Sequence, residues 1–260
     1  MDWCVHLSLV RLQSRQKQFG RGTLCVKQPE ACNHGFGDGG KALQLCVSIV
    51  PIFNHLEPEE MEEVVKTTRP VSLRRGDFLY SAGDASDALS IIHRGKVKVY
   101  RLAENGKEQL IRILDAGDFT GELALFTETI HDAYAEAMEE TEICSIQRPA
   151  LQELLTKYPN ISMKILTEFS RRLNEAENQM TSFTTEDVET RIALYLAEQV
   201  EASRSMEIQL KMTRKDLASY LGTTPETISR KLAKFEDEGW IVQMGQRTIR
   251  ILDLDALLLL

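Results

Sequence analysis

Residues 212–235 have the sequence MTRKDLASYLGTTPETISRKLAKF, which predicts two short helices joined by a tight turn. Thr213 is a suitable N-cap for the first helix, and Asp216 stands three residues later, as in a capping box. Thr224 is the expected N-cap of the second helix. Pro225 then takes the first helical position, where its missing N–H needs no partner. The stretch therefore predicts a helix-turn-helix.

The second of these helices has two faces of different chemistry. Its apolar face, expected to pack on the first helix, consists of Ile228, Leu232 and Phe235. On the opposite face an arginine can donate two hydrogen bonds to guanine, a glutamate can accept from cytosine, and a serine can contact a base or a phosphate. The residues expected to contact DNA are Glu226, Ser229, Arg230, Thr213, Arg214, Thr224, Thr227 and Lys234. Lys215 and Lys231 are further candidates for phosphate contacts. The alternative is a helical hairpin with a solvated charged face.

A predicted β-hairpin follows at residues 240–251, turning at Met244, Gly245 and Gln246. A helix-turn-helix followed by such a wing is more specific for DNA binding than either part alone. Residues 208–250 contain eight basic and five acidic side chains, a local charge of +3 in a chain whose net charge is −8. The overall charge argues against indiscriminate nucleic-acid binding, and the local charge favours a sequence-specific site.

Residues 226–230, ETISR, resemble the recognition helix of Fnr-type regulators in the Crp/Fnr superfamily of bacterial transcription regulators. The resemblance extends over residues 46–257, and it includes the Fnr-like proteins of lactic acid bacteria. It implies an α+β fold with an N-terminal β-roll of the cyclic-nucleotide-binding type, a long dimerisation helix and a C-terminal winged helix-turn-helix. It also implies a TTGA-like half-site on double-stranded DNA and RNA polymerase as a partner. No enzymatic activity is expected, because the sequence has no phosphate loop, no ligand-spaced histidines and no Ser, His and Asp set in a motif context.

Composition and spacing agree with several domains in one chain. The 260 residues with 43% hydrophobic content suffice for two ordinary domains. Short predicted strands at residues 88–93, 96–101 and 108–114 favour a roll or sandwich. The expected division is 1–45 as a poorly structured arm, 46–158 as the roll, 159–183 as the dimerisation helix and 184–260 as the DNA-binding domain. No targeting signal or membrane span is recognisable, so we expect a cytoplasmic protein.

The segment 159–183 predicts a helix with an apolar seam. Its expected dimer contacts are Leu166, Phe169, Leu173, Ala176 and Met180, which alternate steps of three and four residues. Because the other face is polar, a two-stranded dimer helix is favoured over an ordinary buried stripe. A homodimer would place two recognition helices about one DNA turn apart, which predicts a palindromic site.

The sequence also bears on what the roll senses. Gly121, Glu122 and Leu123 resemble the start of the family's phosphate-binding cassette, but Asp132 and Ala133 stand where that cassette has an Arg-Ser pair. A carboxylate repels a phosphate, so cAMP and cGMP are not expected to bind. A regulator or regulatory binding module responding to another small, cyclic-nucleotide-like molecule is the alternative to a redox sensor.

Cysteines are the other candidate sensors. Cys144 matches the distant cluster ligand of Fnr proteins, while Cys25, Cys32 and Cys46 are separated by 6 and 13 residues, more widely than in that family. The alternatives are a 4Fe–4S cluster on these four residues, a reversible disulfide between Cys46 and Cys144, and no redox role. No other metal site is assigned, because the five histidines lack ligand spacing.

Overall fold

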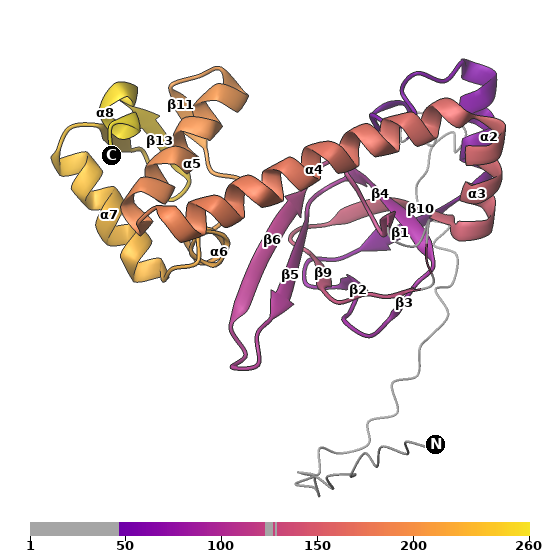
Figure 1. Ribbon diagram of the computed structural model, residues 1–260, viewed down its shortest axis with the longest axis horizontal. Helices are drawn as coiled ribbons and strands as arrows, with labels where there is room; N and C mark the ends of the chain where they lie inside the picture. The colour runs from indigo at the N-terminus through magenta and orange to yellow at the C-terminus, as the bar shows by residue number, and fades with distance from the viewer. Residues whose placement is uncertain (1–46, 123–126, 128) are drawn as a thin grey trace, which may run out of the picture. The chain divides into compact units, whose positions relative to one another are not determined.

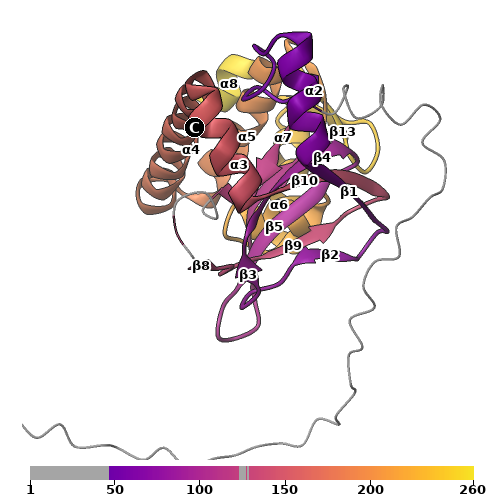
Figure 2. The same cartoon turned by 90° about the vertical axis from the view of Figure 1, so that its right-hand side faces the viewer.

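The computed structural model describes residues 47–122, 127 and 129–260, all within one unit of the chain, Phe36–Leu260. Helix α2 (Pro58–Thr67) has proline at its first position and buries Val64. It packs against α3 (Arg148–Lys157), which also contacts two strands of the neighbouring sheet. Figure 2 shows α2 and α3 beside these strands.

Antiparallel strands form the predicted β-roll (Figure 1). Two four-stranded sheets have the orders β1-β10-β4-β7 and β2-β9-β5-β6, and β3 pairs with β8. The strands are β1 (Thr68–Leu73), β2 (Phe78–Tyr80), β3 (Ala85–Ser86), β4 (Ala88–Arg94), β5 (Val97–Leu102), β6 (Glu108–Leu114), β7 (Phe119–Thr120), β8 (Thr129–Ile130), β9 (Tyr134–Ala137) and β10 (Thr141–Gln147). Inward-facing Ile92, Val97 and Ile143 share a buried cluster, because alternate side chains of a strand point to one face.

The long helix α4 (Pro159–Thr185) follows α3 and leads from the roll to the C-terminal elements (Figure 1). Ile161 and Ile165, near its start, are buried in a core cluster of the roll. The helix ends at Glu186, whose extended backbone allows a change of direction. Asp187 then accepts a hydrogen bond from the Thr190 N–H and caps α5 (Val188–Ser203).

The C-terminal elements form a winged helix-turn-helix, which confirms the predicted fold class. They are α5, β11 (Glu207–Gln209), α6 (Arg214–Tyr220), α7 (Pro225–Asp237), β12 (Ile241–Gln243), β13 (Thr248–Ile251) and α8 (Leu254–Leu258). Strands β12 and β13 are the predicted hairpin, and β13 also pairs with β11, which the sequence patterns did not predict.

Strand β6 of the roll packs on α6. Tyr100 and Leu110 belong to the same buried cluster as Leu217 of α6. The Ser219 hydroxyl accepts from the Leu110 N–H at 2.7 Å and donates to the Glu108 carbonyl at 2.7 Å. The first helix of the helix-turn-helix is thus hydrogen-bonded to the backbone of a strand of the roll.

Candidate nucleic-acid interface

Helix α6 begins with the predicted capping box. The Thr213 hydroxyl accepts from the Asp216 N–H, and the Asp216 carboxylate accepts from the Thr213 N–H. The two exchanged bonds satisfy donors that a helix start otherwise leaves unpaired.

The recognition helix α7 is fixed at its start by Thr224, which accepts from the Thr227 N–H at 3.3 Å. Gly222 precedes it in the left-handed conformation with φ of 67°. This backbone conformation favours glycine, and a Cβ atom here would also make a tight contact, 3.1 Å, with the ring of Phe183 at the end of α4. The long helix therefore packs directly on the turn of the helix-turn-helix.

The predicted base-contacting face of α7 is exposed. Glu226, Ser229 and Arg230 all face solvent, whereas the apolar face is fully buried. A hydrogen bond from its own backbone N–H, followed by one from Thr224, lowers the pKa of Glu226, which keeps this carboxylate an acceptor. The Ser229 hydroxyl donates to the Pro225 carbonyl at 2.9 Å. Within the described part of the chain no hydrogen bond or ion pair engages the Arg230 guanidinium.

Arg214 has a different environment from the one expected for a phosphate contact. Its guanidinium donates to the Gln243 side chain at 2.7 Å, and burial lowers its pKa. Gln243 in turn donates through its backbone and its amide to Glu236, both at 2.8 Å. This chain of hydrogen bonds joins α6, the wing and α7, so it orients the wing relative to both helices. No sequence pattern predicts these hydrogen bonds, because Gln243 belongs to the predicted hairpin and its partners lie on other elements.

Most other basic side chains of the segment are paired within the protein. Lys211 lies 2.7 Å from Asp115, Lys215 lies 3.4 Å from Glu108, and Arg250 lies 2.9 Å from Glu207. Lys231 and Lys234 of α7 both bind Glu189 of α5. Among the described residues of this segment, Arg214, Arg230 and Arg247 lack an ion pair, and of these Arg214 is hydrogen-bonded to Gln243. Glu189 is a functional candidate that sequence analysis missed, because the pair bridges more than forty positions of the chain.

The predicted seam of α4 is exposed except at Phe169. Leu166, Leu173 and Met180 are 52%, 61% and 66% exposed, and Ala176 is also exposed. Phe169, by contrast, packs partly against a core cluster of the roll. The exposed row recurs every seven residues, which is the spacing of a coiled-coil contact position.

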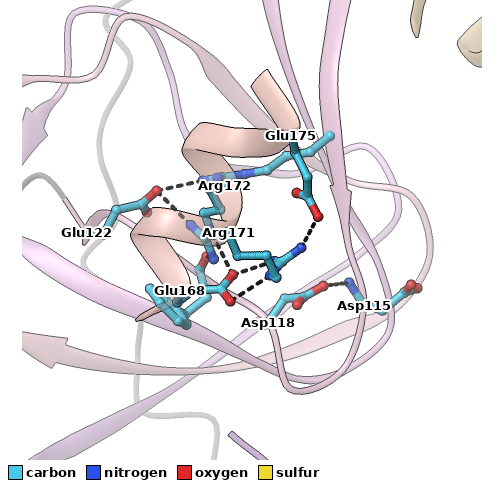
Figure 3. Close-up of polar contacts among 9 residues, drawn as sticks. Asp115, Asp118, Glu122, Glu168, Arg171, Arg172 and Glu175 are labelled. Atoms are coloured by element: carbon cyan, nitrogen blue, oxygen red, sulfur yellow. Dashed lines mark hydrogen bonds and ion pairs between the residues drawn. The ribbon is translucent and has the colours of Figure 1, made fainter. Parts of the chain in front are cut away.

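An ion-pair network connects α4 to the roll (Figure 3). Glu122, in the cassette-like segment, accepts from Arg112 at 3.0 Å and from Arg172 at 2.7 Å. Burial alone would raise the pKa of Glu122, but the two guanidinium groups outweigh it and the pKa lies below its usual value. Arg172 also binds Glu168 at 2.7 Å. The carboxylate of this cassette-like segment is thus already engaged by two arginines.

The remaining sensor candidates are placed only in part. Asp132 pairs with Arg101, and Ala133 is buried, so neither supplies a donor for a phosphate. Leu123 lies outside the described residues. Cys144 is buried in β10, opposite Pro70 of β1 and Ile91 of β4. Cys25, Cys32 and Cys46 lie outside the described residues, and within those residues no group of histidines, cysteines and carboxylates could hold a metal.

The chain is similar to known regulators over most of its length. Residues 70–158 match the cyclic nucleotide-binding domain, and residues 190–260 match the Crp-like helix-turn-helix domain. A probable transcriptional regulator, flp, of Lacticaseibacillus casei is 35% identical over 208 residues, 80% of this chain and 94% of that protein. The fumarate and nitrate reduction regulatory protein of Salmonella typhimurium is 31% identical over 219 residues, 82% of this chain and 85% of that protein.

Solved structures show the same fold. FixK2 from Bradyrhizobium japonicum has a TM-score of 0.64 at 25% identity, covering 73% of this chain and 95% of that chain. A mutant of CooA from Carboxydothermus hydrogenoformans has a TM-score of 0.66 at 25% identity, covering 75% of this chain and 88% of that chain. Among the described helices, none combines the length and apolar character needed to cross a membrane.

Proposed function

Because this chain belongs to the Crp/Fnr family of DNA-binding transcription regulators, we propose that it acts as a homodimer on a palindromic DNA site, with one α7 in each half-site. The observation that carries the proposal is the exposed face of α7, where Arg230 and Glu226 have the chemistry for a guanine and a cytosine. The proposal also assigns phosphate or base contacts to the hydroxyl groups of Ser229, Thr213, Thr224 and Thr227. The half-site is TTGA-like, and RNA polymerase is the expected partner of the bound dimer.

Dimerisation through α4 is supported by its exposed heptad row of Leu166, Leu173 and Met180. A second copy of the helix would bury these three side chains, which are exposed to water in the single chain. The dimer also sets the spacing of the two recognition helices, which is why the site is palindromic.

The signal that we propose is redox state or oxygen, sensed through cysteines. The first form of this proposal is a disulfide between Cys46 and Cys144, and Cys144 lies buried in β10. Two thiols would lose two protons and two electrons to an oxidant such as molecular oxygen, and one S–S bond would form. A 4Fe–4S cluster on Cys25, Cys32, Cys46 and Cys144 is the second form of this proposal. A small effector in the roll is a further candidate. It is disfavoured as a cyclic nucleotide by the pairing of Glu122 and Asp132 with arginines.

The DNA proposal is tested by selecting bound duplexes from a random library with the purified protein. We expect two inverted TTGA-like half-sites. Enrichment of a single, non-repeated motif would contradict the homodimer, and absence of any enriched motif would contradict sequence-specific binding.

The redox proposal is tested by iron and sulfide analysis of protein purified without oxygen. Near four irons per subunit, with an absorption that bleaches in air, would establish the cluster. An iron-free protein that gains a Cys46–Cys144 disulfide on oxidation, with changed DNA affinity, would establish the thiol switch. If neither iron nor an oxidation-dependent disulfide is found, the result would favour a small-molecule effector.

A further inference from the structure

Glu189 is a buried carboxylate that holds two lysines of the recognition helix. Its Oε1 atom lies 2.6 Å from Lys234 Nζ, and its other oxygen pairs with Lys231. The Glu189 side chain is 11% exposed, compared with 26% for Lys231 and 48% for Lys234. Both carboxylate oxygens are therefore occupied by ammonium groups from α7, while the lysines remain within reach of solvent.

The two lysines occupy a flank of α7 close to the base-contacting face. Lys231 is the residue after Arg230, and Lys234 lies about one helical turn after Arg230. This flank borders the groove wall when the N-terminal half of the helix enters the major groove. Unpaired lysines at such positions would contact phosphates, which strengthens binding to any sequence. The hydrogen bond to Glu189 raises the pKa of Lys234, and attraction by the carboxylates of Glu238 and Asp187 adds to the effect. Two positive side chains thus face three negative ones on this flank.

Arg230 and the two lysines differ in whether they are free to contact DNA. Arg230 points away from the core without an intramolecular ion pair among the described residues, whereas Lys231 and Lys234 are held. We propose that Glu189 is a specificity-determining residue, which withholds both lysines from DNA phosphates and so lowers sequence-independent affinity more than affinity for the cognate site. The inference rests on the proposed DNA binding through α7.

The test compares full-length wild-type protein with Glu189→Gln, which keeps the shape of the side chain and removes its charge. Affinity is measured against salt on a random-sequence duplex of about thirty base pairs and on a duplex from the selection. On random DNA we expect the log–log salt slope to steepen by about 1 to 2, since each added phosphate contact contributes about 0.9. At about 0.1 M salt the random-sequence affinity should rise roughly three- to tenfold, with a smaller gain on the selected site.

Two further variants show whether a changed salt slope comes from release of the lysines or only from the loss of one negative charge. Glu201→Gln removes one exposed carboxylate from the same helix, and it should leave the slope unchanged. Lys234→Gln should hardly alter the wild-type slope, yet it should flatten the slope by about 1 in the Glu189→Gln background. Non-additivity of this kind is the signature of a lysine released by the loss of Glu189.

An unchanged slope in folded Glu189→Gln would overturn the inference. So would equal losses of affinity on both duplexes together with a lower melting temperature, because the ion pairs would then only hold α5 to α7. Failure of the wild-type protein to bind any duplex would instead count against the proposed function.

Discussion

Arg230 is the side chain on which base recognition depends most directly. Its guanidinium is exposed at the N-terminal half of α7, so Arg230→Ala should leave the fold intact. We expect a loss of about 1 to 3 kcal/mol on the selected site and relaxed discrimination at one guanine, because one bidentate contact disappears. Competition binding against duplexes substituted at each position measures both effects. Equal losses on selected and random DNA would show that Arg230 contacts only phosphate.

The ion pairs of Glu189 with the two lysines also depend on pH, because they require an ionised carboxylate. Hydrogen bonds from Lys231 and then Lys234 lower the pKa of Glu189 from its ordinary 4.5. A carboxyl with a depressed pKa stabilises the fold above its unfolded pKa, and the contribution is lost as pH falls through the folded value. The difference in salt slope between wild type and Glu189→Gln should therefore stay constant from about pH 6 to pH 8. A difference that shrinks within this range would assign the effect to another titrating group.

Residue-level features were predictable from sequence where they are local. The caps at Thr213 and Thr224 and the exposed face of α7 follow from spacings of three or four residues, and the structure confirms them. The partners of Lys234 and Arg214 were not predictable, because Glu189 and Gln243 reach them through the tertiary fold. The sequence predicted Lys234 as a DNA contact, but its ion pair with Glu189 leads us to expect that the wild-type protein withholds this ammonium group from DNA phosphates.

At the scale of elements, removing one oxygen atom should weaken the contact between β6 and α6. Ser219→Ala removes the hydroxyl that bonds the Leu110 N–H and the Glu108 carbonyl. Leaving these backbone groups unpaired should cost about 1 to 3 kcal/mol locally. We expect faster amide hydrogen exchange in β6 and α6, measured by mass spectrometry. Ser229→Ala, on the exposed face of α7, is the matched control and should leave exchange in β6 unchanged. Unchanged exchange in Ser219→Ala would mean that apolar packing alone holds the contact.

Element types were more predictable than their partners. Glycine-punctuated strands and the heptad pattern of α4 appear in the sequence, and the roll and the long helix follow from them. The three-residue β11 is too short to show a period, and it exists because β13 offers it a pairing edge. The environment of each seam residue of α4 was likewise not predictable. Spacing alone could not show that Phe169 packs on the roll while Leu173 is exposed.

At the scale of the whole molecule, the exposed row of α4 decides between a monomer and a dimer. Leu173 is 61% exposed, so replacing it removes little packing within the chain. In the proposed dimer, Leu173→Glu would place two carboxylates against each other at a coiled-coil contact position, which opposes association. We expect a monomeric mass by light scattering and a large loss of affinity for the palindromic site, because each monomer then binds only one half-site.

Leu102→Glu supplies the matched control, since Leu102 is 47% exposed at the end of β5 and lies outside the seam. This variant should keep the dimeric mass and the wild-type affinity. If Leu173→Glu also keeps the dimeric mass, the two copies must associate through another surface. The spacing of the two α7 helices, and with it the predicted palindrome, would then have to be derived from that surface and not from α4. A monomeric Leu173→Glu that still binds the full palindrome with wild-type affinity would show instead that the dimer contributes nothing to site recognition.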